Sequence, residues 1–170
     1  MYYEDVLKGL NEEGVRYLVV GGVAMVLHGV VRLTVDFDIM LDLAENNLTK
    51  FVSVMDKLGY RPKAPVDSKE FIDSTKRSEW KNKKNMRVFS FHNPKKQFEL
   101  IDVFNENPIN FGKAYSNRVE VNAGGLNIPL ASIKDLKKLK KMAGRSQDIA
   151  DINALDDLVE IMKKEKSYEK

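Results

Sequence analysis

Apolar and polar residues along the chain follow two periodicities, one typical of helices and the other of strands. Apolar side chains recur every three to four positions in most of the predicted helices, which cover 2–13, 46–58, about 132–142 and about 147 to the C-terminus. A shorter helix is predicted at 22–29, directly after a Gly-Gly pair. Short apolar or alternating runs predict strands at 16–20, 34–41, 86–92, 97–104, 118–122 and 126–130.

Turn and cap residues separate these segments. Asn93–Lys96 and Gly124-Gly125 each predict a hairpin turn. Asp67 or Ser68 is expected to cap a short helix, and Ser132 is expected to cap the helix that follows it. The order of elements predicts an α+β fold in which a mixed sheet is flanked by helices. We expect one domain over residues 1–170, with a sheet-containing core at 1–131 and a C-terminal helical part at 132–170.

Composition narrows the class of protein. The 170 residues include no cysteine, which excludes disulfides and cysteine-based metal or redox sites. No apolar run approaches the length that spans a bilayer, and the acidic start of the chain is unlike a signal peptide. We therefore expect a cytoplasmic protein with no membrane partner.

Two aspartates in one predicted strand are the first candidate for chemistry. Asp36 and Asp38 are two positions apart within 34–41, so they project from the same face of a strand. Neighbouring carboxylates repel each other unless a cation or a proton lies between them. Mg²⁺, or Mn²⁺ in its place, prefers oxygen ligands of this kind. The alternative is that a surface strand carries two acids by chance.

Asp102 is the candidate for a third carboxylate. It lies in the apolar predicted strand 97–104, and an acid on an apolar face is costly unless it is paired or binds a metal. Two-metal sites are usually completed by such a residue. The alternative is an acid at the end of a strand that reaches water.

Gly21 and Gly22 join the first predicted strand to the helix at 22–29. Backbone N–H groups at such a turn can bind phosphate, although a Gly-Gly pair can also serve only as a tight turn. Thr34 shares the predicted face of the aspartates and could orient a carboxylate or contact phosphate. Arg32 could do the same, or could pair with Asp36 or Asp38. We expect His28, at the helix end, to be a packing residue.

Two separated motifs resemble the nucleotidyltransferase superfamily that includes DNA polymerase beta. The first is Gly-Gly, a helix and Arg-x-Thr-x-Asp-Phe-Asp-Ile, and the second is Leu-Lys-Lys-Met-Ala-Gly-Arg-Ser-Gln-Asp-Ile-Ala-Asp at 139–151. Within the superfamily the chain is similar to small prokaryotic nucleotidyltransferase-like proteins related to abortive-infection toxins. The motifs cover roughly the first and last quarters of the chain. In the family the position of Gly22 is often Ser, whose hydroxyl adds a phosphate contact.

The resemblance implies roles for two basic residues. Lys140 falls at the edge of the apolar face of its helix, and the family's corresponding lysine is thought to reach the triphosphate. The alternative is a lysine that only extends its charge into water. Arg145 could bind phosphate, or it could bridge to Asp148 or Asp151 and fix the turn between the last two helices.

The positive charge of the chain is concentrated in its middle. Residues 61–100 hold 11 Lys and Arg against 5 Asp and Glu, whereas the whole chain has a net charge of only +3. Basic residues around the single tryptophan, Trp80, could bind RNA by charge and stacking. The favoured alternative is a Trp that anchors a loop to the core, with solvated lysines around it.

These features predict a metal-dependent nucleotidyltransferase that moves an NMP from an NTP to a hydroxyl acceptor and releases pyrophosphate. The acceptor could be RNA such as tRNA, or a protein. Two alternatives stay open: a nucleotide- or RNA-binding module with weak or no catalysis, and the toxin half of a toxin–antitoxin pair whose partner is an antitoxin.

Overall fold

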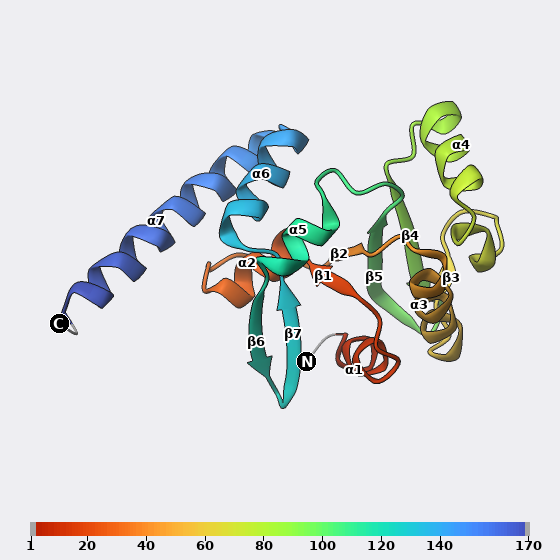
Figure 1. Ribbon diagram of the computed structural model, residues 1–170, viewed down its shortest axis with the longest axis horizontal. Coiled ribbons are helices and arrows are strands. Elements are labelled where there is room, and N and C mark those ends of the chain that lie inside the picture. The colour runs from red at the N-terminus through yellow and green to blue at the C-terminus, as the bar shows by residue number, and fades with distance from the viewer. Residues whose placement is uncertain (1–2, 169–170) are drawn as a thin grey trace.

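The computed structural model describes residues 3–168 (Figure 1). Its helices are α1 (Glu4–Glu12), α2 (Gly21–His28), the short 3₁₀ helix η1 (Ser68–Phe71), α3 (Glu45–Lys57), α4 (Ser74–Lys84), α5 (Phe111–Ser116), α6 (Ile133–Ala143) and α7 (Ser146–Tyr168). Its strands are β1 (Tyr17–Val19), β2 (Phe37–Leu41), β3 (Arg61–Pro62), β4 (Val88–Asn93), β5 (Lys96–Phe104), β6 (Val119–Ala123) and β7 (Leu126–Leu130).

All seven strands form one sheet in the order β3-β4-β5-β2-β1-β7-β6. The pairs β2/β5 and β1/β7 are parallel and the others are antiparallel, so the predicted α+β fold with a mixed sheet is confirmed. The two predicted hairpins are β4–β5 and β6–β7. The neighbouring strands β2 and β5 carry Asp38 and Asp102, two of the three aspartates singled out from the sequence.

The two faces of the sheet differ in character. One face presents Phe37, Ile39 and Leu41 of β2, all buried, and it packs against α1 and α3. Aromatic contacts hold this side together: Tyr3 stacks on Phe37 with a centroid distance of 4.8 Å. Successive residues of a strand point to opposite faces, so Asp38 lies on the other face. Buried Met40 shares the face of Asp38, so on this side of β2 the candidate chemistry lies next to a further part of the core.

Local signals in the sequence correctly placed several element ends. The Ser132 side chain accepts a hydrogen bond from the backbone N–H of Asp135 at the start of α6, and Gly144 ends that helix with φ of 65°. Asp67 caps η1 through a hydrogen bond from the N–H of Lys69. Capping chemistry is local, which is why it can be predicted without knowledge of the tertiary structure.

Other parts of the fold differ from the prediction. Strand β2 begins at Phe37 rather than residue 34, so Thr34 and Asp36 lie in the connection that precedes it. Helices α4 and α5 and strand β3 were not predicted from the pattern. Apolar residues on α4 are few, and its stability depends instead on the Asp73 cap and the burial of Trp80.

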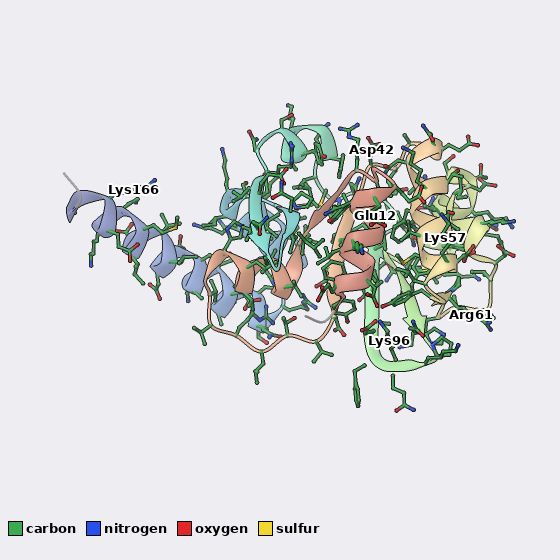
Figure 2. The ribbon with its side chains drawn as sticks, turned by 90° about the horizontal axis from the view of Figure 1, so that it is seen from below. Glu12, Asp42, Lys57, Arg61, Lys96 and Lys166 are labelled. Atoms are coloured by element: carbon green, nitrogen blue, oxygen red, sulfur yellow. The ribbon has the colours of Figure 1, made fainter. Side chains whose placement is uncertain are left out.

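The last helix, α7, packs on α6 near its start and then extends away from the body (Figures 1 and 2). Lys166 lies on the extended part (Figure 2). Its predicted apolar stripe is only partly buried: Leu155 is fully buried, whereas Ile149 is 62% exposed and Met162 is 42% exposed. Among residues 3–168, no helix is both long enough and apolar enough to cross a membrane.

Candidate active site

The parallel pairing of β2 and β5 places Asp38 directly beside Asp102. Residues at matched positions of neighbouring strands share a face, so the two carboxylates project together from the face opposite Phe37, Ile39 and Leu41. Asp36 lies two residues before Asp38, just outside the strand, and is exposed. We call Asp36, Asp38 and Asp102 the carboxylate group.

The carboxylate group is electrostatically strained. The pKa of Asp38 is raised to about 7, first by burial and then by the neighbouring charges of Asp102 and Asp36. The positive charges of Lys140 and Arg145 oppose this shift only in part. The pKa of Asp102 is also raised, first by burial and then by Asp36, while a hydrogen bond from Ser90 opposes the shift. A cation placed between these carboxylates would relieve both effects.

Ser90 on β4 orients Asp102 from its other side. Its hydroxyl donates to Oδ1 of Asp102 at 2.6 Å, and the two residues are register partners in the antiparallel pair β4/β5. This bond leaves the second carboxylate oxygen of Asp102 available to a ligand. The sequence alone gave no signal for Ser90, because its role depends on the pairing of two strands.

The turn between β1 and α2 lies against the carboxylates. A Cβ on Gly21 would fall 2.0 Å from Oδ2 of Asp38, and the residue has φ of +62°, so only glycine fits here. A Cβ on Gly22 would fall 2.3 Å from the Thr34 hydroxyl oxygen. The Thr34 hydroxyl therefore occupies the space where a side chain at position 22 would lie.

Tyr3 fixes the connection that carries Asp36. Its hydroxyl donates to the Val35 carbonyl at 2.8 Å and accepts a hydrogen bond from the N–H of Leu100 at 3.0 Å. These contacts tie Val35, the residue before Asp36, to Leu100 of β5. The pairing of β2 with β5 begins directly afterwards, at Phe37 and Ile101. A tyrosine so far away in the sequence offers no pattern from which this role could be predicted.

Basic residues approach the carboxylate group from α6 and α7. Lys140 is buried, and its Nζ lies 2.6 Å from Oδ2 of Asp151 and 3.2 Å from Oδ1 of Asp148. Arg145 Nε lies 2.9 Å from Oδ2 of Asp148. Burial would raise the pKa of Asp148, but its hydrogen bonds with Arg145 and Lys140 outweigh burial and lower the pKa to about 2.

Arg32 joins the same cluster. Of the two predicted pairings, with Asp36 or with Asp38, neither is present: its Nη1 binds Oδ2 of Asp151 at 2.8 Å. We call Arg32, Lys140, Arg145, Asp148 and Asp151 the ion cluster. It attaches the connection before β2 to the C-terminal helices, and each of its cations already has a carboxylate partner.

A small cavity of about 90 Å³ separates the two groups. Gly21 and Asp38 line it on one side, and Lys140, Arg145 and Asp148 line it on the other. His28 is outside this cavity and binds the Ala131 carbonyl through Nε2 at 2.8 Å, which is the packing role expected for it.

The carboxylate group can supply part of a metal site. Among residues 3–168, no three His, Asp or Glu side chains converge closely enough to hold a metal on their own. Mg²⁺ usually binds one or two carboxylates and completes its shell with water and substrate phosphates. The adjacent, electrostatically strained pair of Asp38 and Asp102 fits that share of the ligands.

The basic segment around Trp80 has the structural role that was favoured from the sequence, in which the tryptophan is anchored in the core. Trp80 is 4% exposed and stacks on Phe89 at 5.0 Å, so its ring is not available to a nucleotide base. Lys76, Lys81 and Lys83 of α4 pair with Glu70, Glu106 and Glu79. This part of the chain is therefore less positive than its sequence suggests.

Solved structures similar to this one define the class of fold. The lincosamide antibiotic adenylyltransferase LnuA matches with a TM-score of 0.57 and 17% identity over 90% of this chain and 93% of that one. ANT(2")-Ia, solved in complex with adenylyl-2"-tobramycin, matches with a TM-score of 0.55 and 14% identity over 98% and 95%. A nucleotidyltransferase-like protein from Paracoccidioides brasiliensis matches with a TM-score of 0.53 and 16% identity over 88% and 71%. The fold is that of the nucleotidyltransferases.

The sequence itself supports the same assignment at the level of a family. Residues 4–163 match the family described as nucleotidyltransferase of unknown function (DUF6036), and the chain belongs to that family. The predicted superfamily resemblance is thereby confirmed. No curated protein matches the sequence significantly.

Proposed function

We propose that the protein is a Mg²⁺- or Mn²⁺-dependent nucleotidyltransferase that moves an NMP from an NTP to a hydroxyl acceptor and releases pyrophosphate. The observation that carries the proposal is the side-by-side placement of Asp38 and Asp102 on neighbouring parallel strands. Two carboxylates held together in this way, with Asp36 close by, are stabilised by a proton or by a bound cation, and the cation is the occupant that the proposed reaction requires. Family membership and the fold agree with this chemistry.

The carboxylates have distinct roles in the proposed reaction. Asp36, Asp38 and Asp102, together with water and substrate phosphates, would hold the metal, which when bound would neutralise phosphate charge and make the acceptor hydroxyl more acidic. The free oxygen of Asp102 accepts the proton of that hydroxyl, while Ser90 holds the other oxygen. The acceptor oxygen forms a bond to the α-phosphorus as the bond to the β-phosphate oxygen breaks, and pyrophosphate leaves.

The triphosphate would lie along the β1–α2 turn. Backbone N–H groups at Gly21 and Gly22 would bind its β- and γ-phosphates. The Thr34 hydroxyl, which occupies the space beside Gly22, supplies the side-chain contact that a glycine cannot make. Lys140, Arg145 and Arg32 would neutralise the charge of the leaving pyrophosphate. To do so they must exchange part of their contact with Asp148 and Asp151 for contact with phosphate.

A labelled-NTP transfer assay tests the proposal. The four NTPs, Mg²⁺ or Mn²⁺, and total cellular RNA and protein as acceptors would be incubated with the wild type and with Asp38→Asn. We expect label transfer by the wild type and a loss of at least 100-fold in the variant. Asp42→Asn is the matched control, because Asp42 also lies near β2 but pairs with Arg16 on the surface.

Equilibrium binding separates metal use from turnover. Mg²⁺-dependent NTP binding should be lost in Asp36→Ala and kept in Asp42→Asn. Unchanged NTP binding by Asp36→Ala, or transfer that survives in Asp38→Asn, would show that these carboxylates do not hold the metal.

A second candidate function is a nucleotide-binding module with little turnover. The observation that favours it is the ion cluster, in which Lys140 and Arg145 are bound by aspartates rather than left for phosphate, beside a cavity of only about 90 Å³. Metal-dependent NTP binding without transfer to any acceptor would select this function.

A further inference from the structure

A second, larger cleft lies on the outer side of α6, away from the carboxylate group. Its volume is about 720 Å³, and it is formed by α5 with the residues on either side of it, by α6, and by Val159 of α7. Five lysines line it against a single aspartate; they are Lys113, Lys134, Lys137, Lys138 and Lys141. We call this cavity the lysine cleft.

Most of the positive charge in the lysine cleft is not neutralised. Within residues 3–168, Lys137 pairs with Asp156, and the other four lysines make no ion pair. The carboxylate of Asp135, the one acid in the cleft, accepts a hydrogen bond from the Ser132 hydroxyl at the start of α6. The lysines of α4 behave differently, since most of those are paired with glutamates.

The spacing of the lysines suits a repeating anion. Lys134, Lys138 and Lys141 are four and three residues apart on α6, so their side chains leave one face about 5–6 Å from each other. Together they span about 10 Å of helix. A stacked polynucleotide strand advances about 3.4 Å per phosphate, so the row covers about three phosphates. A single small anion would use only one of these positions.

The lysine cleft is connected to the candidate active site through shared elements. The C-terminal turn of α6 carries Lys141 in the cleft and Ala143 in the small cavity that Asp38 lines. Phe104 at the end of β5 lines the small cavity, and Ile109 a few residues later lines the cleft. The two cavities are therefore neighbours along the same segments of the chain.

We propose that the lysine cleft binds the phosphodiester backbone of a single-stranded polynucleotide, the end of which is the hydroxyl acceptor. The inference rests on the proposed function and names its acceptor class. A concave cavity suits a strand that lies within it, whereas an anionic membrane would require a flat or convex basic surface. The residues that attract the acceptor therefore lie on α5 and α6, not in the basic segment at 61–100.

Fluorescence anisotropy with short labelled single-stranded RNA and DNA tests the proposal. The variant Lys134→Glu/Lys138→Glu/Lys141→Glu should lose at least tenfold in affinity. Its slope of log affinity against log salt should be shallower by about 2, because three phosphate contacts are removed. The control Lys76→Glu/Lys81→Glu/Lys83→Glu has the same change of charge on α4 and should lose less than threefold.

Three further measurements make the outcome decisive. Circular dichroism establishes whether both variants fold. If the charge reversal on α6 unfolds the protein, a variant with Lys→Gln at the same three positions takes its place. Equal loss in the α4 control, or unchanged affinity in the α6 variant, would overturn the proposal. The proposal would also be overturned if the α6 variant no longer bound phosphatidylserine vesicles but still bound polynucleotides. Binding of both RNA and DNA supports recognition of the phosphodiester backbone. Binding of RNA alone supports the proposal and identifies RNA as the acceptor.

The same variants distinguish failure of this inference from failure of the proposed function. If the α6 variant still binds NTP but no longer labels a polynucleotide, both stand. If the wild type transfers label to a polynucleotide and the α6 variant does so equally well, the function stands and the cleft proposal fails. If no transfer occurs but polynucleotide binding depends on the α6 lysines, the cleft is a binding site and the proposed catalysis fails.

Discussion

The carboxylate group and the ion cluster face each other across one small cavity, and their aspartates are in opposite electrostatic states. The pKa of Asp38 is raised to about 7 because burial and neighbouring carboxylates oppose its charge. The pKa of Asp148 is lowered to about 2 because Arg145 and Lys140 outweigh its burial. The first group gains from a bound cation, whereas the second already has its cations. In the proposed reaction, a metal–triphosphate complex would provide positive charge for one side and competing negative charge for the other.

The largest effect is expected from breaking the ion cluster at Asp151. This buried aspartate is the shared partner of two cations, the buried Lys140 and the half-buried Arg32. Asp151→Ala leaves both without that carboxylate, and removal of one partner from a buried ion pair costs about 3–5 kcal/mol. We expect a loss of this size in the free energy of unfolding, measured by urea denaturation.

Asp156→Ala provides the matched control for Asp151→Ala. Asp156 is also on α7 and also pairs with a lysine of α6, but the pair is at the surface. Its loss should cost less than about 1 kcal/mol. Similar costs for the two variants would mean that the buried cluster contributes no more than a surface pair.

The ion cluster also marks the limit of what the sequence could predict. The helix boundary at Gly144 and the cap at Ser132 follow from local chemistry, and both were predicted. The bridge between Arg145 and Asp148 was one of two predicted options, because the two residues are three positions apart. The contact of Arg32 with Asp151 joins positions 119 residues apart, and no local pattern predicts such a pair.

A smaller change of opposite sign is expected at Asp38. Its proton is bound more tightly in the folded protein than in the unfolded chain, where the pKa is near the ordinary value of 3.8. Stability is therefore lost as the pH rises from about 4 to about 7, and it stays lower above that range. Asp38→Asn removes this cost, so the variant should be more stable than the wild type by up to about 4 kcal/mol at pH 8 and similar to it near pH 4.

Thermal denaturation at several pH values in a chelating buffer measures this difference. Adding Mg²⁺ should stabilise the wild type more than Asp38→Asn, because only the wild type has the full carboxylate group. Asp42→Asn, which removes an exposed pair with Arg16, should show no gain at pH 8. A wild type as stable as Asp38→Asn at pH 8 would mean that the carboxylate group is not strained.

The carboxylate group was more accessible to sequence reasoning than the ion cluster. Alternation along a strand predicted that Asp36 and Asp38 share a face, but Asp36 lies just before β2 and only Asp38 is in the strand. The apolar surroundings of Asp102 singled it out. The pairing of Asp38 with Asp102 depends on the order of strands in the sheet, which the pattern does not contain. Ser90 binds Asp102, and Tyr3 binds the backbone beside Asp36, only because residues distant in the sequence are brought together by the fold.

The smallest predicted effect on stability concerns Tyr3. A change at Tyr3 alters the position of the connection that carries Asp36 without changing the charge of the carboxylate group. Tyr3→Phe keeps the stacking on Phe37 but loses the hydroxyl that ties Val35 to Leu100. The lost hydrogen bonds should cost about 1–2 kcal/mol. Tyr17→Phe is matched in cost, because the Tyr17 hydroxyl donates to Oδ1 of Asn11 at 2.9 Å.

The two tyrosine variants should differ in metal-dependent NTP binding. Tyr17 pairs with Leu41, at the end of β2 away from Asp36, so Tyr17→Phe should leave the binding constant unchanged. Tyr3→Phe frees the connection that carries Asp36, and the affinity for the Mg²⁺–NTP complex should fall several-fold, as measured by isothermal titration calorimetry. If the two variants bind equally well, the position of Asp36 is set by the strand itself. If only Tyr3→Phe binds weakly, the third carboxylate is held in place by the hydroxyl of the residue that precedes α1 rather than by the sheet.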